Sequence, residues 1–455
     1  MTYEEFLAAK IHSSIEHGFA PGFVPEAAFG FQRALLEWAC RIGRAAIFAE
    51  CGMGKTLIEL AWAQNVVEHT NRPVLVMAPL AVSAQTVREG EKFGIAVERS
   101  RDGSFTSRGI VVTNYEKLHL FDASKFAGIV CDEASILKSF DGATRTAIIE
   151  FSRKLPYRLL ATATPAPNDT IELGNASEAL GHLGYTDMLS RFFTNAEQSL
   201  SPIALACKWR LKPHATVSFW RWVCSWARAV RRPSDLGFDD GPMVLPALHN
   251  RVTVVEASVP RPGQLFVESA RDLREQRQDR RATINKRCEA VAQLSSDADS
   301  FVAWCHLNDE GDLLENIVPG AIQVSGKDSD EEKEEKFEAF CSGQARVLVT
   351  KSKVAGLGMN WQHCNRMSFF PSHSYEQMYQ SVRRCWRYGQ KREVTVDIVT
   401  TNGEPLVLEN LERKARAAEE MFDLLVKNMK DEYAITPGVR PASKRFESPA
   451  WLKGA

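Results

Sequence analysis

A glycine-containing loop that ends in Lys-Thr is the clearest chemical feature of the sequence. Residues 50–56 read ECGMGKT and lie between a short apolar run and a helical pattern. Glycines in such a loop let backbone N–H groups turn onto phosphate oxygens, and the start of the helix adds a partial positive charge. Lys55 is predicted to reach the β- and γ-phosphates of a nucleotide, and Thr56 to hold Mg²⁺. The predicted loop residues are Gly52, Met53, Gly54, Lys55 and Thr56.

Two adjacent acids, Asp132 and Glu133, follow another apolar run at residues 128–131. The carboxyl end of a buried strand is where ligands bind in open α/β sheets. One carboxylate there can orient Mg²⁺ and its water shell, and the other can orient or deprotonate an attacking water. Together with the upstream Lys55 loop, the pair predicts a nucleotide-hydrolysing site.

The elements that must position these residues form a repeating pattern. Apolar runs rich in Val and Ile, without polar alternation, suit parallel strands that are buried on both faces and linked by helices. Five such runs in the first half are residues 45–49, 74–77, 110–113, 128–131 and 158–161. Five more in the second half are residues 300–305, 321–324, 346–350, 366–370 and 394–399. The pattern predicts an α/β protein with two mostly parallel sheets flanked by helices.

Changes in composition divide the chain into five parts. A short helical segment is followed by the first α/β unit, and an aromatic and basic stretch then interrupts the alternation before the second unit begins. The last residues contain three prolines and a net positive charge, which predicts a flexible tail. The predicted boundaries are 1–24, 25–183, 184–262, 263–432 and 433–455.

Composition excludes several classes of protein. The 455 residues are enough for two or three domains at roughly 150 residues each. The net charge of −1 means that any nucleic-acid surface must be a local patch. Ten cysteines without CxxC spacing argue against a zinc finger and fit reduced thiols. Without a signal-peptide pattern or a run of about 18 apolar residues, we expect a cytoplasmic protein with no membrane segment.

The motifs, taken in order, resemble those of superfamily 2 helicases, and most closely the SWI/SNF-type branch. In the first half, AECGMGKT resembles motif I, VLVMAPLAV motif Ia, VVTNYEKL the motif Ib region, VCDEAS motif II and ATATPAPND motif III. In the second half, TKSKVAGLGMNW resembles motif V and QSVRRCWRYGQ resembles motif VI. Ser135 and Arg383 depart from common superfamily residues, His and Gly respectively. The compact chain, without accessory-domain signatures, is typical of a microbial or phage-type member.

This resemblance implies two RecA-like lobes with ATP and Mg²⁺ between them, joined by a helical connector. It implies that Gln32 reads adenine, that Asp132 organises Mg²⁺ and that Glu133 is the catalytic base. From the second lobe, Gln380 would approach the γ-phosphate, and Arg384 and Arg387 would be arginine fingers. Motif V would sense nucleotide and nucleic acid through Gly356, Gly358 and Asn360. The remaining nucleic-acid contacts implied by the motifs are Pro79 and Asn114.

A basic and aromatic stretch at residues 207–232 lies outside these motifs. Its arginines could neutralise DNA phosphates and its rings could stack on exposed bases. Because Phe219, Trp222 and Trp226 recur at helical spacing, they could equally form a core-facing stripe. We therefore expect the aromatics to anchor a helix and the arginines to contact DNA. The arginines concerned are Arg228, Arg231 and Arg232.

The predicted function is that of an ATP-dependent DNA translocase or helicase, which moves along or remodels DNA. The expected partner is duplex or forked DNA, with replication or recombination proteins as candidate partners, and the expected state is a monomer in the cytoplasm or the nucleoid of a host cell. An RNA helicase is one alternative. A catalytically silent, nucleic-acid-binding scaffold is another, although the retained Lys55, Glu133 and Arg384 favour activity.

Overall fold

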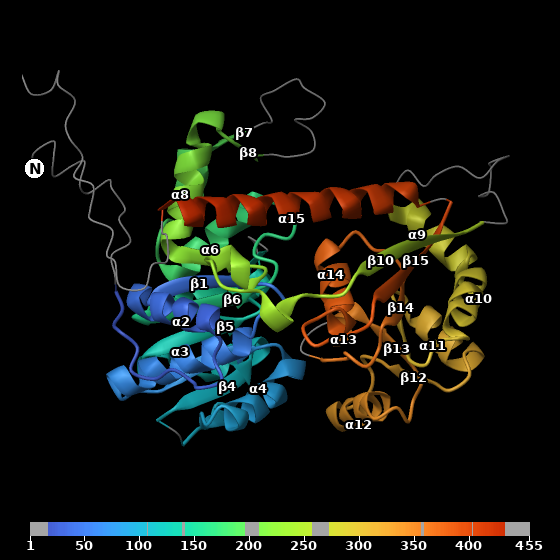
Figure 1. The fold of residues 1–455 in the computed structure, drawn as a ribbon, viewed down its shortest axis with the longest axis horizontal. Helices are drawn as coiled ribbons and strands as arrows, with labels where there is room; N and C mark the ends of the chain where they lie inside the picture. The colour runs from blue at the N-terminus through green and yellow to red at the C-terminus, as the bar shows by residue number, and fades with distance from the viewer. Residues whose placement is uncertain are drawn as a thin grey trace, which may run out of the picture.

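The computed structural model describes residues 17–106, 108–138, 142–195, 209–256, 273–355, 359–402 and 404–432. The helix predicted near the N-terminus and the tail predicted from residue 433 lie outside these ranges. Two lobes lie side by side, each built around a parallel sheet with helices packed on it (Figure 1). Among the described residues, no helix is both long and apolar enough to cross a membrane.

Lobe 1 contains a seven-stranded parallel sheet in the order β3-β4-β2-β5-β6-β1-β9. Every residue of its inner strands β2 and β4 is buried, as expected for apolar runs covered on both faces. The strands are β1 (Arg44–Ala49), β2 (Val74–Ala78), β3 (Val97–Arg99), β4 (Ile110–Asn114), β5 (Gly128–Asp132), β6 (Tyr157–Thr162) and β9 (Ala227–Val230). The helices are α2 (Gly30–Ile42), α3 (Lys55–Thr70), α4 (Leu80–Lys92), α5 (Ala143–Ser152), α6 (Leu173–Leu180), α7 (Tyr185–Phe192) and α8 (Thr216–Trp226).

Lobe 2 contains a six-stranded parallel sheet in the order β10-β15-β14-β11-β13-β12. Its strands are β10 (Leu248–Val255), β11 (Phe301–Cys305), β12 (Ala321–Val324), β13 (Val347–Lys351), β14 (Arg366–Phe369) and β15 (Val394–Thr401). Its helices are α9 (Leu273–Ala282), α10 (Ile284–Ser295), α11 (Asn308–Ile317), α12 (Asp330–Cys341), α13 (Ser352–Ala355), α14 (Tyr375–Cys385) and α15 (Pro405–Glu432). Two mostly parallel sheets flanked by helices confirm the predicted fold class.

The stretch predicted as a connector, residues 184–262, is largely built into the lobes. Helix α8 packs on lobe 1, and β9 forms the edge of the lobe 1 sheet through parallel pairing with β1. A short antiparallel pair, β7 (Phe193–Asn195) and β8 (Trp209–Leu211), lies between α7 and α8. The last strand of the stretch, β10, pairs in parallel with β15 in lobe 2. The described residues between β9 and β10 form the crossing between the lobes.

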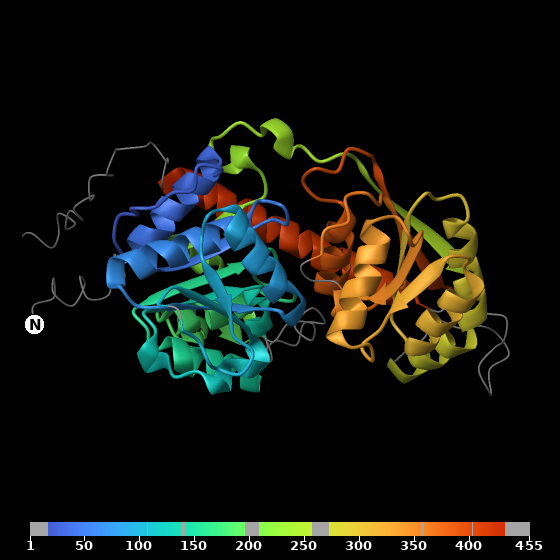
Figure 2. The same ribbon diagram turned by 90° about the horizontal axis from the view of Figure 1, so that it is seen from below.

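The long helix α15 starts in lobe 2 and ends against lobe 1, and Figures 1 and 2 show it running across both. Its C-terminal half packs on α8 and β9, where the Cys224 thiol lies 3.7 Å from the Leu425 carbonyl oxygen. The backbone N–H of Ala229 donates to the Met429 sulfur at 3.2 Å. The α15 side chains buried in the lobe 1 core are Met421, Phe422, Leu425, Val426 and Met429. A helix from the end of the chain therefore ties the second lobe to the first.

Candidate nucleotide site

The phosphate-binding loop connects β1 to α3. Gly52 has φ 93° and Gly54 has φ 75°, left-handed values that favour glycine, and α3 begins immediately afterwards at Lys55. The Lys55 ammonium donates to the Ala49 carbonyl oxygen at 2.9 Å, so its side chain folds back over the loop. The loop backbone and the start of α3 form the arrangement that binds phosphate in proteins.

Gln32 on α2 supports this loop from behind. Its side-chain amide donates to the Met53 carbonyl oxygen at 2.9 Å, and its own oxygen accepts from the Phe29 N–H at 2.9 Å. A Cβ atom on Gly54 would lie 2.3 Å from Gln32 Nε2. Glycine at position 54 is therefore favoured by its φ angle, and a side chain there would displace the Gln32 amide. The Gln32 side chain, which was predicted to read adenine, here contacts the phosphate-binding loop and the start of α2.

The carboxylate pair lies at the carboxyl end of β5, as predicted. Glu133 has a left-handed φ of 58°, which is rare for a residue with a side chain and costs about 1–3 kcal/mol. Its Oε1 atom accepts from the Thr162 hydroxyl at 2.8 Å and from the Ser135 hydroxyl at 3.2 Å. Ser135, which stands where the superfamily commonly has His, therefore contacts Glu133. Thr162 links motif III directly to motif II.

Asp132 lies in strongly acidic surroundings. Burial, with the neighbouring Glu133 charge adding to it, raises the pKa of Asp132 to about 6. The Tyr115 hydroxyl donates to the Asp132 carbonyl oxygen at 2.6 Å and holds the strand end in place. Sequence reasoning missed a third acid, Glu59 on α3, which is 1% exposed and whose pKa is raised by burial and by the Asp132 charge. Its position four residues after Lys55, on the same helical face, was the available signal.

Motif VI forms α14 and the turn after it in lobe 2. Gln380 and Arg384 are buried one helical turn apart, and Arg384 Nε donates to the Gln380 carbonyl oxygen at 2.9 Å. Arg384 and Arg387 each donate from Nη1 to the Met359 carbonyl oxygen at 3.2 Å. Burial and the charge of Arg384 lower the pKa of Arg387, while Cys51 in the loop raises it. Among the described residues, neither guanidinium forms an ion pair with a carboxylate.

The two lobes meet at this place. A Cβ atom on Gly52 would lie 3.1 Å from the backbone nitrogen of Tyr388, so the loop of lobe 1 and the end of motif VI are in contact. On the same helix α14, Glu376 pairs with Lys138, which follows motif II. In motif III, the Asn168 oxygen accepts from the Lys414 ammonium of α15 at 3.0 Å. The structure therefore places the lobe 1 motifs that hold Lys55 and Glu133 in contact with lobe 2, whose motif VI holds Arg384 and Arg387.

The residues of motifs Ia, Ib and V that were predicted to contact nucleic acid lie in both lobes. Asn114 pairs in register with Ala78, so Asn114 and the following Pro79 lie at the same edge of the sheet. The Asn114 side chain is 7% exposed and caps the next turn by accepting from the Lys117 N–H. Asn360 in lobe 2 is exposed, and the motif V glycines Gly356 and Gly358 lie outside the described residues.

The three arginines predicted to contact DNA differ in their surroundings. Arg228 is 4% exposed, donates to the Ala227 carbonyl oxygen at 3.2 Å, and stacks 4.4 Å from the centre of the Trp38 ring. The structure therefore assigns Arg228 a packing role in place of the predicted DNA contact. Arg231 pairs with Asp423 of α15, and Arg232 lies 3.8 Å from Asp235 while remaining largely exposed. The aromatic residues of α8 are buried, as a core-facing stripe would be.

Comparison with known proteins agrees with this geometry. Residues 31–177 match the family model of the SNF2-related domain. This match confirms the resemblance to the SWI/SNF-type branch of superfamily 2. The matched SNF2-related segment holds Gln32, the phosphate-binding loop, the carboxylate pair and motif III, which are the lobe 1 half of the candidate site.

A solved structure described as a Sulfolobus solfataricus SWI2/SNF2 ATPase core in complex with dsDNA is similar to the chain at 17% sequence identity. The similarity covers 90% of this chain and 95% of that chain, with a TM-score of 0.42. A search of curated proteins gave no match.

Proposed function

We propose that the chain is an ATP-dependent DNA translocase or helicase that hydrolyses ATP between its two lobes. The observation that carries the proposal is the contact between the phosphate-binding loop and the end of motif VI, the motif that supplies the guanidinium groups of Arg384 and Arg387. Both bind a backbone carbonyl oxygen and, within the described part of the chain, no carboxylate. Two such buried or half-buried cations, on a motif that contacts the predicted phosphate-binding loop, are suited to an anionic ligand.

Each predicted residue has a chemical task in this proposal. Lys55 and the loop N–H groups bind the phosphates, while Glu133, oriented by Thr162, positions and deprotonates the attacking water. Arg384 and Arg387 stabilise the charge that develops on the transferred phosphoryl group, with Gln380 beside them. Because these groups come from different lobes, hydrolysis depends on how closely the lobes approach each other.

A magnesium ion fits the oxygen donors on the lobe 1 side. Thr56 and Asp132 would hold it together with the nucleotide phosphates, and when bound it would neutralise phosphate charge. The acids around it support the fit, because Asp132 lies beside Glu133 and Glu59 and has a raised pKa. A divalent cation would relieve the repulsion among these carboxylates.

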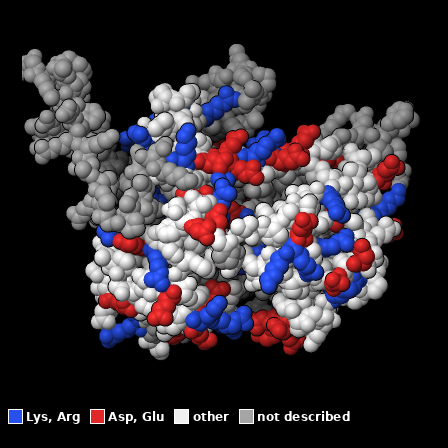
Figure 3. All heavy atoms as spheres, in the orientation of Figure 1, with Lys and Arg blue, Asp and Glu red and all other residues white. Residues whose placement is uncertain are grey.

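The choice of DNA as the track is supported by the SNF2-related match and by the motif III and motif VI sequences, Thr-Pro and Gly-Gln. Pro79 and Asn114 share one edge of lobe 1, and Asn360 is exposed in lobe 2. In the face seen in Figure 3, Lys and Arg are interspersed with Asp and Glu. We therefore expect DNA contacts to be local and salt-sensitive.

A triplex-displacement assay tests movement along duplex DNA. The chain is given ATP and a duplex that carries a third strand, and the predicted result is ATP-dependent release of that strand. Lys55→Ala, which lacks the loop cation, should give no release. Unwinding of an RNA duplex with no activity on DNA would favour the RNA helicase. Binding of DNA without any ATP turnover would favour the silent scaffold.

A further inference from the structure

Arg383 of motif VI stands where many members of the superfamily have Gly. In this structure its side chain has a partner in the other lobe. Its guanidinium forms an ion pair with Glu50, the residue that joins β1 to the phosphate-binding loop. Arg383 is 5% exposed and Glu50 is 9% exposed. Breaking a buried ion pair by removing one member is strongly destabilising, because the remaining charge is left without a partner.

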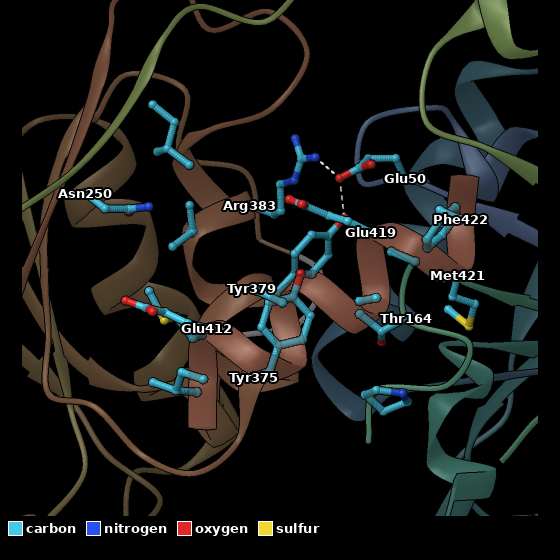
Figure 4. A pocket seen from close by; sticks show the side chains of 18 of the residues that line it. Glu50, Thr164, Asn250, Tyr375, Tyr379, Arg383, Glu412, Glu419, Met421 and Phe422 are labelled. Atoms are coloured by element: carbon cyan, nitrogen blue, oxygen red, sulfur yellow. Dashed lines mark hydrogen bonds and ion pairs between the residues drawn. The ribbon is translucent and has the colours of Figure 1, made fainter. Parts of the chain in front are cut away.

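Figure 4 shows Glu50 joined to both Arg383 and Tyr379 of α14. The Tyr379 hydroxyl, one turn earlier on α14, donates to Glu50. The Arg383 guanidinium lies 4.2 Å from the centre of the Trp386 ring and 5.4 Å from that of Tyr379. Stacking on two rings fixes the direction of the guanidinium before it meets the carboxylate.

A cavity beside the Glu50–Arg383 pair makes this ion pair important for the distance between the lobes. A cavity of about 650 Å³ lies beside the pair, between lobe 1, lobe 2 and α15. Thr164 of motif III, Trp386 and Phe422 are among the residues that line it. The lobes are therefore unpacked on that side of Glu50.

We propose that Glu50 and Arg383 form an inter-lobe pair that sets the approach of motif VI to the phosphate-binding loop, with Arg383 acting as a positioning residue. The inference rests on the proposed ATPase function. Arg384 follows Arg383 directly on α14, and Arg387 lies just beyond the end of that helix at Cys385. Anchoring Arg383 to lobe 1 therefore holds the backbone that carries both other arginines close to the loop. Glu50 directly precedes the loop, so the same pair fixes the loop.

Kinetics separate positioning from simple stabilisation. For Glu50→Gln or Arg383→Gln we expect kcat to fall about tenfold or more, with KM for ATP changed less than about threefold, because the lost alignment matters in the transition state. Arg383→Lys, which keeps the charge, should recover part of kcat. The swapped variant, Glu50→Arg with Arg383→Glu, should turn over at least about threefold faster than either reversed single variant. Equal effects on kcat and KM, or a swap no better than the single variants, would overturn the proposal.

The matched control is the second inter-lobe ion pair of α14, between Lys138 and Glu376. The Lys138 side chain is 38% exposed, so this pair is screened by solvent and should contribute less. We expect Glu376→Gln to keep kcat within about threefold of the unaltered chain. A loss as large as that of Glu50→Gln would show that any inter-lobe charge acts alike, and would contradict a specific role for Arg383.

Hydrogen–deuterium exchange tests the Glu50–Arg383 pair independently of ATPase activity. Peptides covering the phosphate-binding loop and α14 should both exchange faster in Glu50→Gln than in Glu376→Gln. If the unaltered chain hydrolyses no ATP, the proposed function fails, yet this comparison still tests the inter-lobe pair. Unchanged exchange in both peptides would overturn the pair even in an active enzyme.

Discussion

The hydroxyl of Thr162 donates to Glu133 Oε1 at 2.8 Å and joins the ends of two adjacent strands, β6 and β5. Through this bond motif III orients the acid that motif II supplies. The backbone N–H of Thr164 in turn donates to the Thr162 hydroxyl oxygen at 3.0 Å, so the donor itself is held in place. Orientation of Glu133 therefore depends on a loop that also contacts α15 through Asn168.

Replacement of Thr162 tests this link. Thr162→Val keeps the shape and removes the hydroxyl, and we expect kcat for ATP to fall about tenfold, the equivalent of one lost hydrogen bond of about 1.4 kcal/mol. Thr164→Val is the matched control, because the buried Thr164 hydroxyl has no hydrogen-bond partner among the described residues. Steady-state ATPase assays compare the two, and similar rates would show that Thr162 does not orient the base.

The arginines of motif VI should act in the transition state. For Arg384→Ala and Arg387→Ala we expect kcat to fall about a thousandfold, the scale of arginine fingers, while ATP affinity changes much less. Rates come from a phosphate-release assay and affinities from a fluorescent ATP analogue. Loss of ATP binding with kcat retained would assign these residues to ground-state binding instead.

Two adjacent leucines of α15, one buried and one partly exposed, test the packing of this helix on lobe 1. Leu425 is 1% exposed in the lobe 1 core, so Leu425→Ala should lower the free energy of unfolding by about 2–5 kcal/mol. The adjacent Leu424 is 36% exposed, and Leu424→Ala should change the free energy of unfolding by less than about 0.5 kcal/mol. Urea denaturation measures both, and equal values would mean that α15 does not pack on lobe 1 in solution.

Arg228 should affect stability and leave DNA binding alone. Arg228→Ala removes the stacking on Trp38 and a buried hydrogen bond, and we expect a loss of about 1–3 kcal/mol of unfolding free energy. At a temperature where the variant is folded, the slope of DNA affinity against salt concentration should match the unaltered chain. A flatter slope of DNA affinity against salt concentration would indicate that Arg228 contacts DNA.

Stability should fall on acidification through His182. Burial and nearby arginines lower the pKa of His182 from 6.5 to about 4, and its Nε2 atom lies 2.9 Å from the Arg44 carbonyl oxygen. The unfolded chain takes up this proton near pH 6.5 and the folded chain only near pH 4. The stabilisation is therefore complete above pH 6.5 and is lost between about pH 6.5 and 4.

His182→Gln keeps an N–H donor and removes the titrating ring. We expect its unfolding free energy to fall less steeply than that of the unaltered chain between pH 6.5 and 4, as measured by denaturation at several pH values. Parallel curves would mean that other groups cause the acid sensitivity.

Local patterns were sufficient for ten strands, but they did not predict the edge strands β3, β9 and β10. They also predicted the phosphate-binding loop and the acid pair of lobe 1, but not Glu59. The apolar run before Gly52 and the run before Asp132 become β1 and β5, because buried parallel strands need little beyond continuous apolar residues. The Glu50 contacts could not be predicted in this way, since Tyr379 lies 329 positions further along the chain. The basic stretch was misjudged because charge alone does not show that Arg228 folds back onto Trp38.

ATP turnover by the purified chain, measured with and without duplex DNA, tests the central claim most directly. The account predicts turnover that rises about tenfold or more with duplex DNA, absence of turnover in Lys55→Ala, and retained ATP binding with very slow turnover in Glu133→Gln. Circular dichroism of both variants should match the unaltered chain. Absence of ATP hydrolysis by the folded chain with any nucleic acid, or near-normal hydrolysis by Lys55→Ala, would contradict it.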